Sequence, residues 1–317
     1  MLQLLTIGSG SIVELFLDGV RRTEGIELAA VYSRSRDRAE VFGRKHGAKV
    51  WSDDLDALLA REDVNCVYVA APNSLHYGYV RRALEAGKNV ICEKPFVDTA
   101  AQCRELGELA RAKGVYLFEA ISVLHMPVYN QVKAWLKKIG PVRLADIRYC
   151  QYSSRYDMFL RGEITNVFNP LFGGGAMRDI NVYNLHVMAD LFGLPREGIY
   201  IANRGNNGVD CSGTAVFTYD GMVCTCTGAK DCDGENHALF EGEKGYITVT
   251  SAGNAWSRAE LHLRGHEAQE ISTDLPNCLQ PEIEAFVRII GAGDRAQADA
   301  LLEESGKVMQ ILDMIEA

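Results

Sequence analysis

Lys94 occupies a position in the sequence where a lysine can take part in chemistry. It follows the short apolar run Val90–Cys92 and lies between an acid, Glu93, and a proline, Pro95. In an open parallel sheet, side chains just beyond the carboxyl ends of strands face ligands rather than the core. Pro95 restricts the residue before it, so Lys94 is expected in an extended or turn conformation. An amine held there can polarise a carbonyl or stabilise a developing negative charge. The alternative is an ordinary solvated lysine.

A second group of reactive side chains follows the glycine run Gly173–Gly175, where a helix is predicted to begin near Ala176. At 100° per residue, four polar side chains fall within about 60° of one another on this otherwise apolar helix. These are Asp179, Tyr183, His186 and Asp190. Tyrosine and histidine carry protons in general acid–base catalysis, and a carboxylate one turn away can orient a tyrosine. The alternative is a solvent-exposed helix stripe.

The amino terminus has the pattern of a strand, a glycine turn and a helix. The apolar run Leu2–Ile7 leads into Gly8-Ser-Gly10, and residues 11–18 have helical period. A dinucleotide-binding fingerprint needs this order, because the glycines admit a pyrophosphate to the helix N-terminus. The third glycine position of the fingerprint holds Val13. The predicted cofactor contacts in this loop are Gly8, Gly10, Ser11 and Ile12.

Strands alternate with helices through the first 120 or so residues. Strands are expected at 27–32, 66–70, 89–92 and 115–119, and helices at 36–46, 54–60, 75–86 and 99–113. Such βαβ units specify a doubly wound parallel sheet with helices on its faces, the Rossmann fold. We therefore predict an α/β dinucleotide-binding domain over residues 1–122.

Arginines follow the second strand, where the adenosine ribose of a dinucleotide binds. The strand ends in Ser33 and Arg34, with Arg36 and Arg38 close behind. An arginine here suits a 2′-phosphate, whereas a carboxylate suits the free ribose hydroxyls. We therefore predict NADP as the cofactor, with contacts from Ser33, Arg34 and Arg38. NAD is the alternative, because Asp37 can also reach the ribose.

Two further loops are predicted to line the cofactor groove. One is the polar loop that follows the strand at 66–70, and the other follows the strand at 89–92. The predicted contacts there are Ala71, Pro72, Asn73, His76, Glu93 and Lys94. The alternative for His76, which opens a helix, is an exposed first-turn residue.

The second half of the chain has a different pattern. A helix is expected from Pro127 to about Lys138, then a long strand over 142–153, and seven short strands between 199 and 271. Short strands at this spacing indicate an antiparallel or mixed sheet with one open face. We predict an α+β domain over residues 123–317 that binds substrate and forms a homodimer or larger homo-oligomer through this sheet. The last two helices are expected to pack back on the first domain.

Composition excludes several classes of protein. A net charge of -9 and a pI near 5.4 argue against nucleic-acid or anionic-membrane partners. No signal peptide or run of about 18 apolar residues is present, which predicts a cytoplasmic location. Nine cysteines do not suggest a disulfide framework. Cys224 and Cys226, with Cys232 and His237 nearby, lack a matching second pair, so no metal site is predicted.

Three motifs together resemble the glucose-fructose oxidoreductase, inositol dehydrogenase and rhizopine catabolism (Gfo/Idh/MocA) family. They are Gly8-x-Gly10, Glu93-Lys94-Pro95 and the segment from Asn169 to Tyr183 that contains Gly-Gly-Gly-Ala-Met-Arg-Asp. The resemblance spans the chain and implies an NAD(P)-dependent oxidoreductase acting on a sugar, cyclitol or diol. It places Lys94 and Tyr183 at the reacting carbon. A tyrosine at this position is similar to the dimeric dihydrodiol dehydrogenase and glucose-fructose oxidoreductase branch.

Two departures from the family pattern bear on the site. Asn181 stands where the family commonly has glycine, and His125 stands where many members have an arginine near the nicotinamide. The predicted substrate contacts are His125, Arg155, Tyr156 and His186.

The predicted reaction is hydride transfer between the nicotinamide and a hydroxyl-bearing carbon of a small polyol or sugar. Tyr183 is expected to exchange the hydroxyl proton, Lys94 to stabilise the tyrosinate or polarise the carbonyl, and Asp179 to position the pair. The rival is a non-catalytic protein that senses NADP or serves as a scaffold. A sensor needs none of these three residues together, which argues against it.

Overall fold

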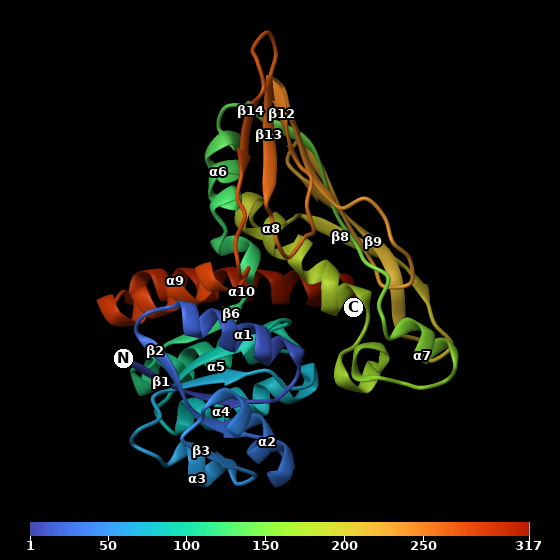
Figure 1. Cartoon of the computed structure of the whole chain (residues 1–317). Helices are drawn as coiled ribbons and strands as arrows, with labels where there is room; N and C mark the ends of the chain where they lie inside the picture. Colours follow the sequence, from blue (N-terminus) through green and yellow to red (C-terminus); the bar gives the residue numbers. More distant parts are fainter. Residues whose placement is uncertain (317) are drawn as a thin grey trace. The chain divides into compact units, whose positions relative to one another are not determined.

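The computed structural model describes residues 1–316, and its internal contacts divide the chain into two units. The first unit contains Met1–Ala120 and Asn277–Gly306, and the second contains Ile121–Pro276 and the chain from Lys307 onward. In Figure 1 the colours run from blue at the N-terminus to red at the C-terminus, so the first unit contains both blue and red segments. The chain therefore returns to its first unit after building most of the second.

The first unit is built on six parallel strands in the order β3-β2-β1-β4-β5-β6. Their bounds are β1 Leu2–Ile7, β2 Ile26–Tyr32, β3 Val50–Ser52, β4 Cys66–Val69, β5 Asn89–Glu93 and β6 Leu117–Ala120. The strand order reverses between β1 and β4, and ligands bind at such a switch point, beyond the carboxyl ends of the strands. The predicted Rossmann fold is confirmed. The short strand β3 was not predicted.

Side chains cap three of the five helices in residues 1–120. The helices are α1 Ser11–Arg22, α2 Arg36–His46, α3 Leu55–Leu59, α4 His76–Glu85 and α5 Ala100–Lys113. The side chains of Ser35, Asp54 and Thr99 accept backbone hydrogen bonds at the starts of α2, α3 and α5. Gly47 and Gly114 end α2 and α5 in the left-handed conformation, which costs glycine little.

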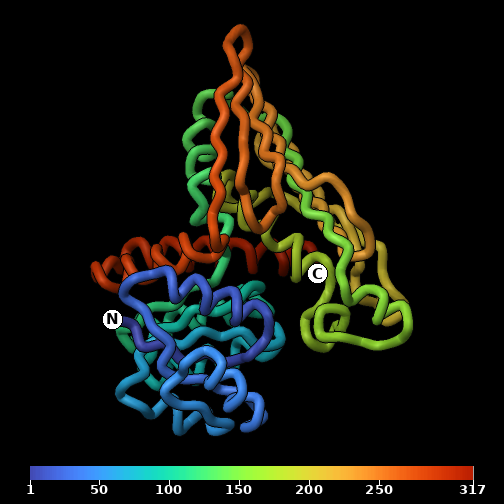
Figure 2. The backbone as a smooth tube through the Cα atoms, in the orientation of Figure 1, coloured from blue at the N-terminus to red at the C-terminus, as the bar shows by residue number. Residues whose placement is uncertain are grey.

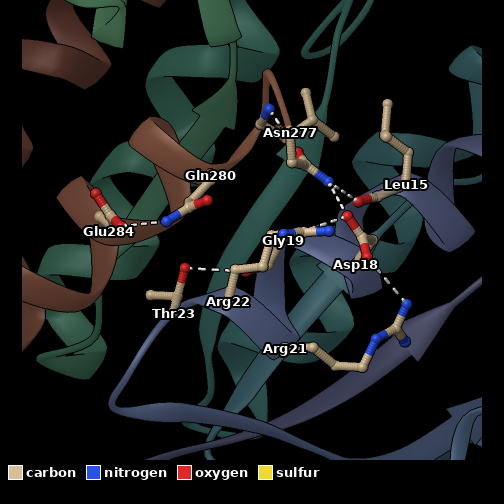
Figure 3. Close-up of polar contacts among 10 residues, drawn as sticks. Leu15, Asp18, Gly19, Arg21, Arg22, Thr23, Asn277, Gln280 and Glu284 are labelled. Carbon is tan, nitrogen blue, oxygen red and sulfur yellow. Dashed lines mark hydrogen bonds and ion pairs between the residues drawn. The ribbon is translucent and has the colours of Figure 1, made fainter. Parts of the chain in front are cut away.

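The returning segment supplies α9 (Gln280–Ala292) and the first part of α10 (Arg295–Glu316). Figure 2 shows the red trace of α9 beside the blue trace of α1. The two helices approach closely at Gly19, where an added Cβ would lie 2.7 Å from Ile283 Cδ1. Figure 3 shows Asn277 at the start of this segment donating from Nδ2 to Leu15 O and to Asp18 Oδ2, each at 2.9 Å.

The second unit contains an eight-stranded sheet in the order β14-β13-β12-β11-β7-β10-β9-β8. Its strands are β7 Val142–Cys150, β8 Glu197–Arg204, β9 Asp210–Tyr219, β10 Met222–Ala229, β11 His237–Gly242, β12 Gly245–Val249, β13 Arg258–Leu263 and β14 Gln269–Ser272. Neighbours are antiparallel except β7 and β10, which are parallel. The predicted mostly antiparallel sheet is confirmed, and the parallel central pair is a detail that strand spacing does not reveal.

The two faces of this sheet differ in what covers them. Helices α6 (Pro127–Leu136) and α8 (Val182–Phe192) contact its strands and are drawn beside it in Figure 1. Exposed and half-buried residues alternate along β8, and buried residues alternate with more exposed ones along most of β10, as they do in a sheet covered on one face. The uncovered face carries five large apolar side chains that are at least 40% exposed: Leu144, Ile199, Ile201, Val223 and Tyr246.

Candidate active site

The glycine loop after β1 is shaped by close contact with β4. Gly8 has a φ of 122°, and an added Cβ would lie 2.3 Å from the carbonyl oxygen of Ala70. Only glycine fits this position without moving the backbone. Val13, at the third position of the fingerprint, is completely buried in the core beneath the loop. Its side chain therefore packs inside the domain and does not fill the loop.

The N-terminus of α1 is suited to bind phosphate. Gly10 is its N-cap and has an extended backbone without a side-chain hydrogen bond to the helix. Ser11, the first residue of this 12-residue helix, is exposed. Backbone N–H groups of a first turn that lack a side-chain acceptor bind anions, with support from the helix dipole. The loop therefore fits the pyrophosphate of a dinucleotide.

Positive charge is concentrated beyond the carboxyl end of β2. Arg34, Arg36 and Arg38 are exposed, and within residues 1–316 none of them forms an ion pair with a carboxylate. In contrast, Arg22 of α1 and Arg44 at the far end of α2 are paired with acids of their own helices. Three guanidinium groups without acidic partners provide strong donors for a phosphate.

His76 lies inside the first unit. Its ring is completely buried, and its two nitrogens lie 2.9 Å from the carbonyl oxygens of Ala71 and Pro95. We expected His76 to contact the cofactor or to be an exposed helix residue, and its burial corrects both expectations. The ring instead joins the loop after β4 to the loop after β5. Asn73, with Ala71 and Pro72, is half-buried and stays a predicted cofactor contact.

The side chain of Glu93 holds the backbone of Lys94 by a hydrogen bond. Its carboxylate is 8% exposed, accepts a 2.5 Å hydrogen bond from the Tyr68 hydroxyl and accepts another from the Lys94 N–H at 3.3 Å. Burial raises the pKa of Glu93, and the positive charge of Lys94 partly opposes that shift. The carboxylate therefore holds the turn that presents Lys94, and a contact of Glu93 with the cofactor stays a prediction. Lys94 itself is half-buried.

In the second unit, the helix that carries Asp179 begins on an aspartate from the sheet. Asp210 Oδ2 accepts hydrogen bonds from the Met177 N–H and the Tyr200 hydroxyl, each at 2.7 Å. Gly175 has a φ of 126°, and an added Cβ would lie 1.9 Å from Asp210 Oδ1. The glycine run therefore lets the chain approach Asp210 closely enough for Asp210 to cap the helix.

The first turn of this helix is π-helical. This turn, η5 (Met177–Asn181), contains Asp179 and runs directly into α8 with Tyr183. Such turns are often found at functional sites, because the inserted residue changes the direction of the side chains. Both Asp179 and Tyr183 are half-buried, and the ring of Tyr183 meets the edge of Tyr149 at 6.1 Å.

The predicted polar stripe does not form one site. His186 is 1% exposed, so the structure offers no support for its predicted contact with substrate. Asp190 is paired with Lys133 at 2.7 Å and also accepts from the Tyr129 hydroxyl. Only Asp179 and Tyr183 therefore stay candidates for chemistry. Tyr183, His186 and Asp190 keep helical spacing within α8, and the π-turn affects only the position of Asp179 relative to them. The pattern did not predict that most of the surface of α8 is buried.

Asn181, the departure from the family pattern, fixes the helix to β10. Its Nδ2 donates to Cys226 O at 2.9 Å, and its Oδ1 accepts from Asn184 Nδ2 at 2.7 Å. An added Cβ on Gly228 would lie 2.7 Å from Asn181 Cβ, so the glycine of the strand makes room for the asparagine of the helix.

Lys230 is a residue of this region that we did not predict. It directly follows β10, is 5% exposed, and forms an ion pair with Asp179. A sequence signal was present, because Lys230 ends an apolar strand as Lys94 does. Its partner could not be predicted, since Asp179 is distant in the sequence.

The remaining substrate candidates belong to the second unit and differ in exposure. His125 ends the short turn η2 (Ser122–His125) and is half-buried, whereas Arg155 is exposed just before α7 (Tyr156–Leu160). Tyr156 packs in an aromatic cluster, with its ring centroid 5.6 Å from that of Phe168. These three positions stay predictions.

Residues 1–316 contain neither a metal-binding cluster nor a membrane-spanning helix. No group of three or more His, Cys, Asp or Glu side chains is arranged to hold a metal ion. No helix in this part of the chain is long and apolar enough to cross a membrane.

Both halves of the chain match models of one enzyme family. Residues 2–121 match "Oxidoreductase family, NAD-binding Rossmann fold", and residues 129–248 match the "GFO/IDH/MocA C-terminal domain". The chain belongs to the Gfo/Idh/MocA family of oxidoreductases. The family suggested by the sequence motifs, and the prediction of an enzyme of the oxidoreductase class, are therefore confirmed.

Similar proteins extend over nearly the whole chain. The scyllo-inositol 2-dehydrogenase (NADP(+)) of Bacillus subtilis is 33% identical over 314 residues, covering 99% of this chain and 95% of that protein. The trans-1,2-dihydrobenzene-1,2-diol dehydrogenase of Xenopus tropicalis is 26% identical, covering 80% and 75%. A 3-ketoreductase from Actinomadura kijaniata, solved with NADP and TDP-benzene, has a TM-score of 0.87, 25% identity, and coverage of 99% and 97%.

Proposed function

We propose that this protein is an NADP-dependent oxidoreductase that transfers a hydride between the nicotinamide and a hydroxyl-bearing carbon of a sugar, cyclitol or diol. The observation that carries the proposal is that the reactive residues lie on two backbone segments that buried side chains hold in place. Lys94 is presented by a turn that Glu93 supports, and Asp179 and Tyr183 are presented by a helix that begins on Asp210. The relatives that act on cyclitol and diol substrates support the substrate class.

Each residue has a role that its chemistry allows. Tyr183 exchanges the proton of the substrate hydroxyl through its phenol, and Lys94 stabilises the tyrosinate or polarises the carbonyl. Asp179 orients this pair. When bound, the nicotinamide supplies the acceptor or donor of the hydride. The backbone at Gly8, Gly10 and Ser11 holds the dinucleotide at the N-terminus of α1.

The preference for NADP follows from the charge beyond β2. The exposed, unpaired guanidinium groups of Arg34 and Arg38 are suited to a 2′-phosphate, and Ser33 lies beside them. The Bacillus subtilis relative carries NADP(+) in its name, and the 3-ketoreductase was solved with NADP. The alternative of a non-catalytic NADP sensor or scaffold has no supporting observation, since Lys94, Asp179 and Tyr183 are all present.

The proposed role of Tyr183 is tested by replacing it with phenylalanine. Reduced-nicotinamide absorbance is followed with NADP and a panel of scyllo-inositol, trans-1,2-dihydrobenzene-1,2-diol and common aldoses. We expect Tyr183→Phe to lower turnover by about 10²- to 10⁴-fold, the range for a lost general acid or base, with little change in the Kd for NADP. Near-normal turnover of this variant would remove Tyr183 from the mechanism, and His125 would be tested next.

A matched control is Tyr219→Phe. The Tyr219 hydroxyl donates to Gly193 O at 3.0 Å, just beyond the carboxyl end of α8, whereas Tyr183 lies near its start. Each variant removes one phenolic hydroxyl, from α8 itself in Tyr183→Phe and from a residue that contacts the end of α8 in Tyr219→Phe. Turnover should stay within about threefold of the parent in Tyr219→Phe if the effect at Tyr183 is chemical.

The cofactor preference is tested by replacing Arg34 with aspartate. Loss of a charge-assisted phosphate contact should weaken NADP binding by about 10- to 100-fold and reverse the preference toward NAD. Dissociation constants for both cofactors provide the measurement. Arg44→Asp, at the far end of α2, serves as the control and should leave the ratio unchanged. Equal affinity of the parent protein for NADP and NAD would contradict the proposal.

We further propose that the uncovered face of the second sheet binds a second copy of this chain. Five large apolar side chains are exposed on one face of this sheet, and burying them against a partner is favourable. The cytoplasmic location expected from the sequence stays a prediction.

A further inference from the structure

Lys230 is held in the second unit by its own backbone. Its N–H donates to Cys211 O at 2.8 Å, and its carbonyl oxygen accepts from the Ser153 N–H at 2.9 Å. These bonds tie the end of β10 to β9 on one side and to the segment before α7 on the other. The origin of the side chain is therefore fixed.

The ammonium group has two partners inside the protein. Nζ forms an ion pair with Asp179 Oδ2 and lies 5.6 Å from the centroid of the Phe168 ring. Phe168 is itself completely buried, with its ring stacked 5.1 Å from that of Phe159. A buried ammonium is costly unless it is paired, so these two contacts define where Nζ lies.

The surroundings of this ion pair are acidic. The ends of β9 and β10 that flank Lys230 carry Asp210, which is 9% exposed, and Asp231, which accepts from the Ser212 hydroxyl at 2.9 Å. Like charges repel one another most strongly where water is scarce. Without the ammonium, the carboxylate of Asp179 would turn away from this end of the sheet.

We propose that Lys230 is a positioning residue for the reaction, one that holds the carboxylate of Asp179 where Asp179 orients Tyr183. The inference rests on the proposed function. It explains why a lysine is buried at the end of β10 although it has no place in the proton transfer itself. Through Phe168, Lys230 also links Asp179 to the aromatic cluster of Tyr156, a candidate substrate contact.

The test compares Lys230→Met and Lys230→Arg, assayed with NADP and the same substrate panel. Moving a catalytic group by about 1 Å can lower the reaction rate by about 100-fold. We therefore expect Lys230→Met to lower kcat by about 10- to 100-fold. The KM for substrate and the Kd for NADP should change less than about threefold. Lys230→Arg keeps the charge and should recover most of kcat.

A double variant separates positioning from a general structural role. If Lys230 acts through Asp179, Lys230→Met combined with Asp179→Asn should be no slower than Asp179→Asn alone. Multiplying effects would contradict the proposal. Lys133→Met is the matched control, because Lys133 pairs with Asp190 of α8, which lies outside the proposed site. The kcat of Lys133→Met should equal that of the parent.

The outcomes distinguish this inference from the proposed function. If the parent protein turns over no member of the panel, the proposed function fails, and if Tyr183→Phe keeps its activity, the proposed role of Tyr183 fails. If Tyr183→Phe loses activity while Lys230→Met keeps it, only the role of Lys230 fails. Should Lys230→Met prove unfolded by circular dichroism, Lys230→Gln against Lys230→Arg gives the same comparison, and equal kcat values for these two would overturn the inference.

Discussion

Two carboxyl groups of the first unit that influence one another are buried, Glu93 beside Lys94 and Glu282 on α9. Glu282 of α9 is 1% exposed, and its Oε2 has no hydrogen-bond partner. Burial, and then the negative charge of Glu93, raise the pKa of Glu282 well above its ordinary range. Burial also raises the pKa of Glu93. Both groups therefore retain their protons to higher pH in the folded protein than in the unfolded chain.

This retention predicts how stability depends on pH. A carboxyl group whose pKa is raised by folding opposes folding more strongly as pH rises from about 4.5 towards its folded value. Glu282→Gln removes this penalty, so the variant should gain stability relative to the parent as pH increases. For one proton the gain is at most about 1.4 kcal/mol per pH unit.

Urea denaturation at several pH values between 4 and 8 measures the effect. Glu284→Gln is the matched control, because Glu284 is exposed on the same helix and accepts from Gln280 Nε2 at 2.8 Å. Its difference from the parent should not vary with pH. A constant difference for Glu282→Gln would mean that Glu282 is ionised in the folded protein.

At the scale of elements, one asparagine joins the returning segment to α1. Asn277 is 3% exposed, donates to Leu15 O and Asp18 Oδ2, and accepts from the Leu279 N–H at 2.8 Å (Figure 3). Hydrogen bonds from Arg22, and secondly from Asn277, lower the pKa of Asp18 to about 2. That pairing favours folding above about pH 4 and is lost as pH falls towards 2.

Asn277→Ala should lower the free energy of unfolding by about 1–3 kcal/mol, because it leaves buried backbone groups without partners. The measurement is urea denaturation at neutral pH. Gln280→Ala, which removes only the contact with Glu284 on the surface of α9, should change stability by less than about 0.5 kcal/mol. Equal effects of the two substitutions would show that Asn277 does not anchor the segment.

At the scale of the whole molecule, the uncovered sheet predicts self-association. Light scattering at micromolar concentration should give at least twice the chain mass of 35.0 kDa. Ile201→Glu, on the 68% exposed Ile201 of β8, should reduce the mass to that of one chain. Leu171→Glu is the control, because Leu171 is 82% exposed but lies outside the sheet. A monomeric parent protein would contradict the proposal.

Much of the architecture was predictable because it depends on local patterns. The alternation of apolar strands with helices defined the Rossmann fold, and the short strands after residue 198 defined the second sheet. Gly8 and Gly175 were predictable as special positions, since both have positive φ values that only glycine adopts easily. The three family motifs, read with this pattern, also led to the confirmed family.

Other features were decided only by the tertiary structure, since they depend on residues that are distant in the sequence. The ion pair of Lys230 with Asp179 forms because β10 ends beside η5, and no spacing rule reports that proximity. His76 is buried because two loops close over its ring. His186 is buried because the part of α8 that carries it is covered by the rest of the second unit. Periodicity predicts which face a side chain occupies, whereas packing decides what that face meets.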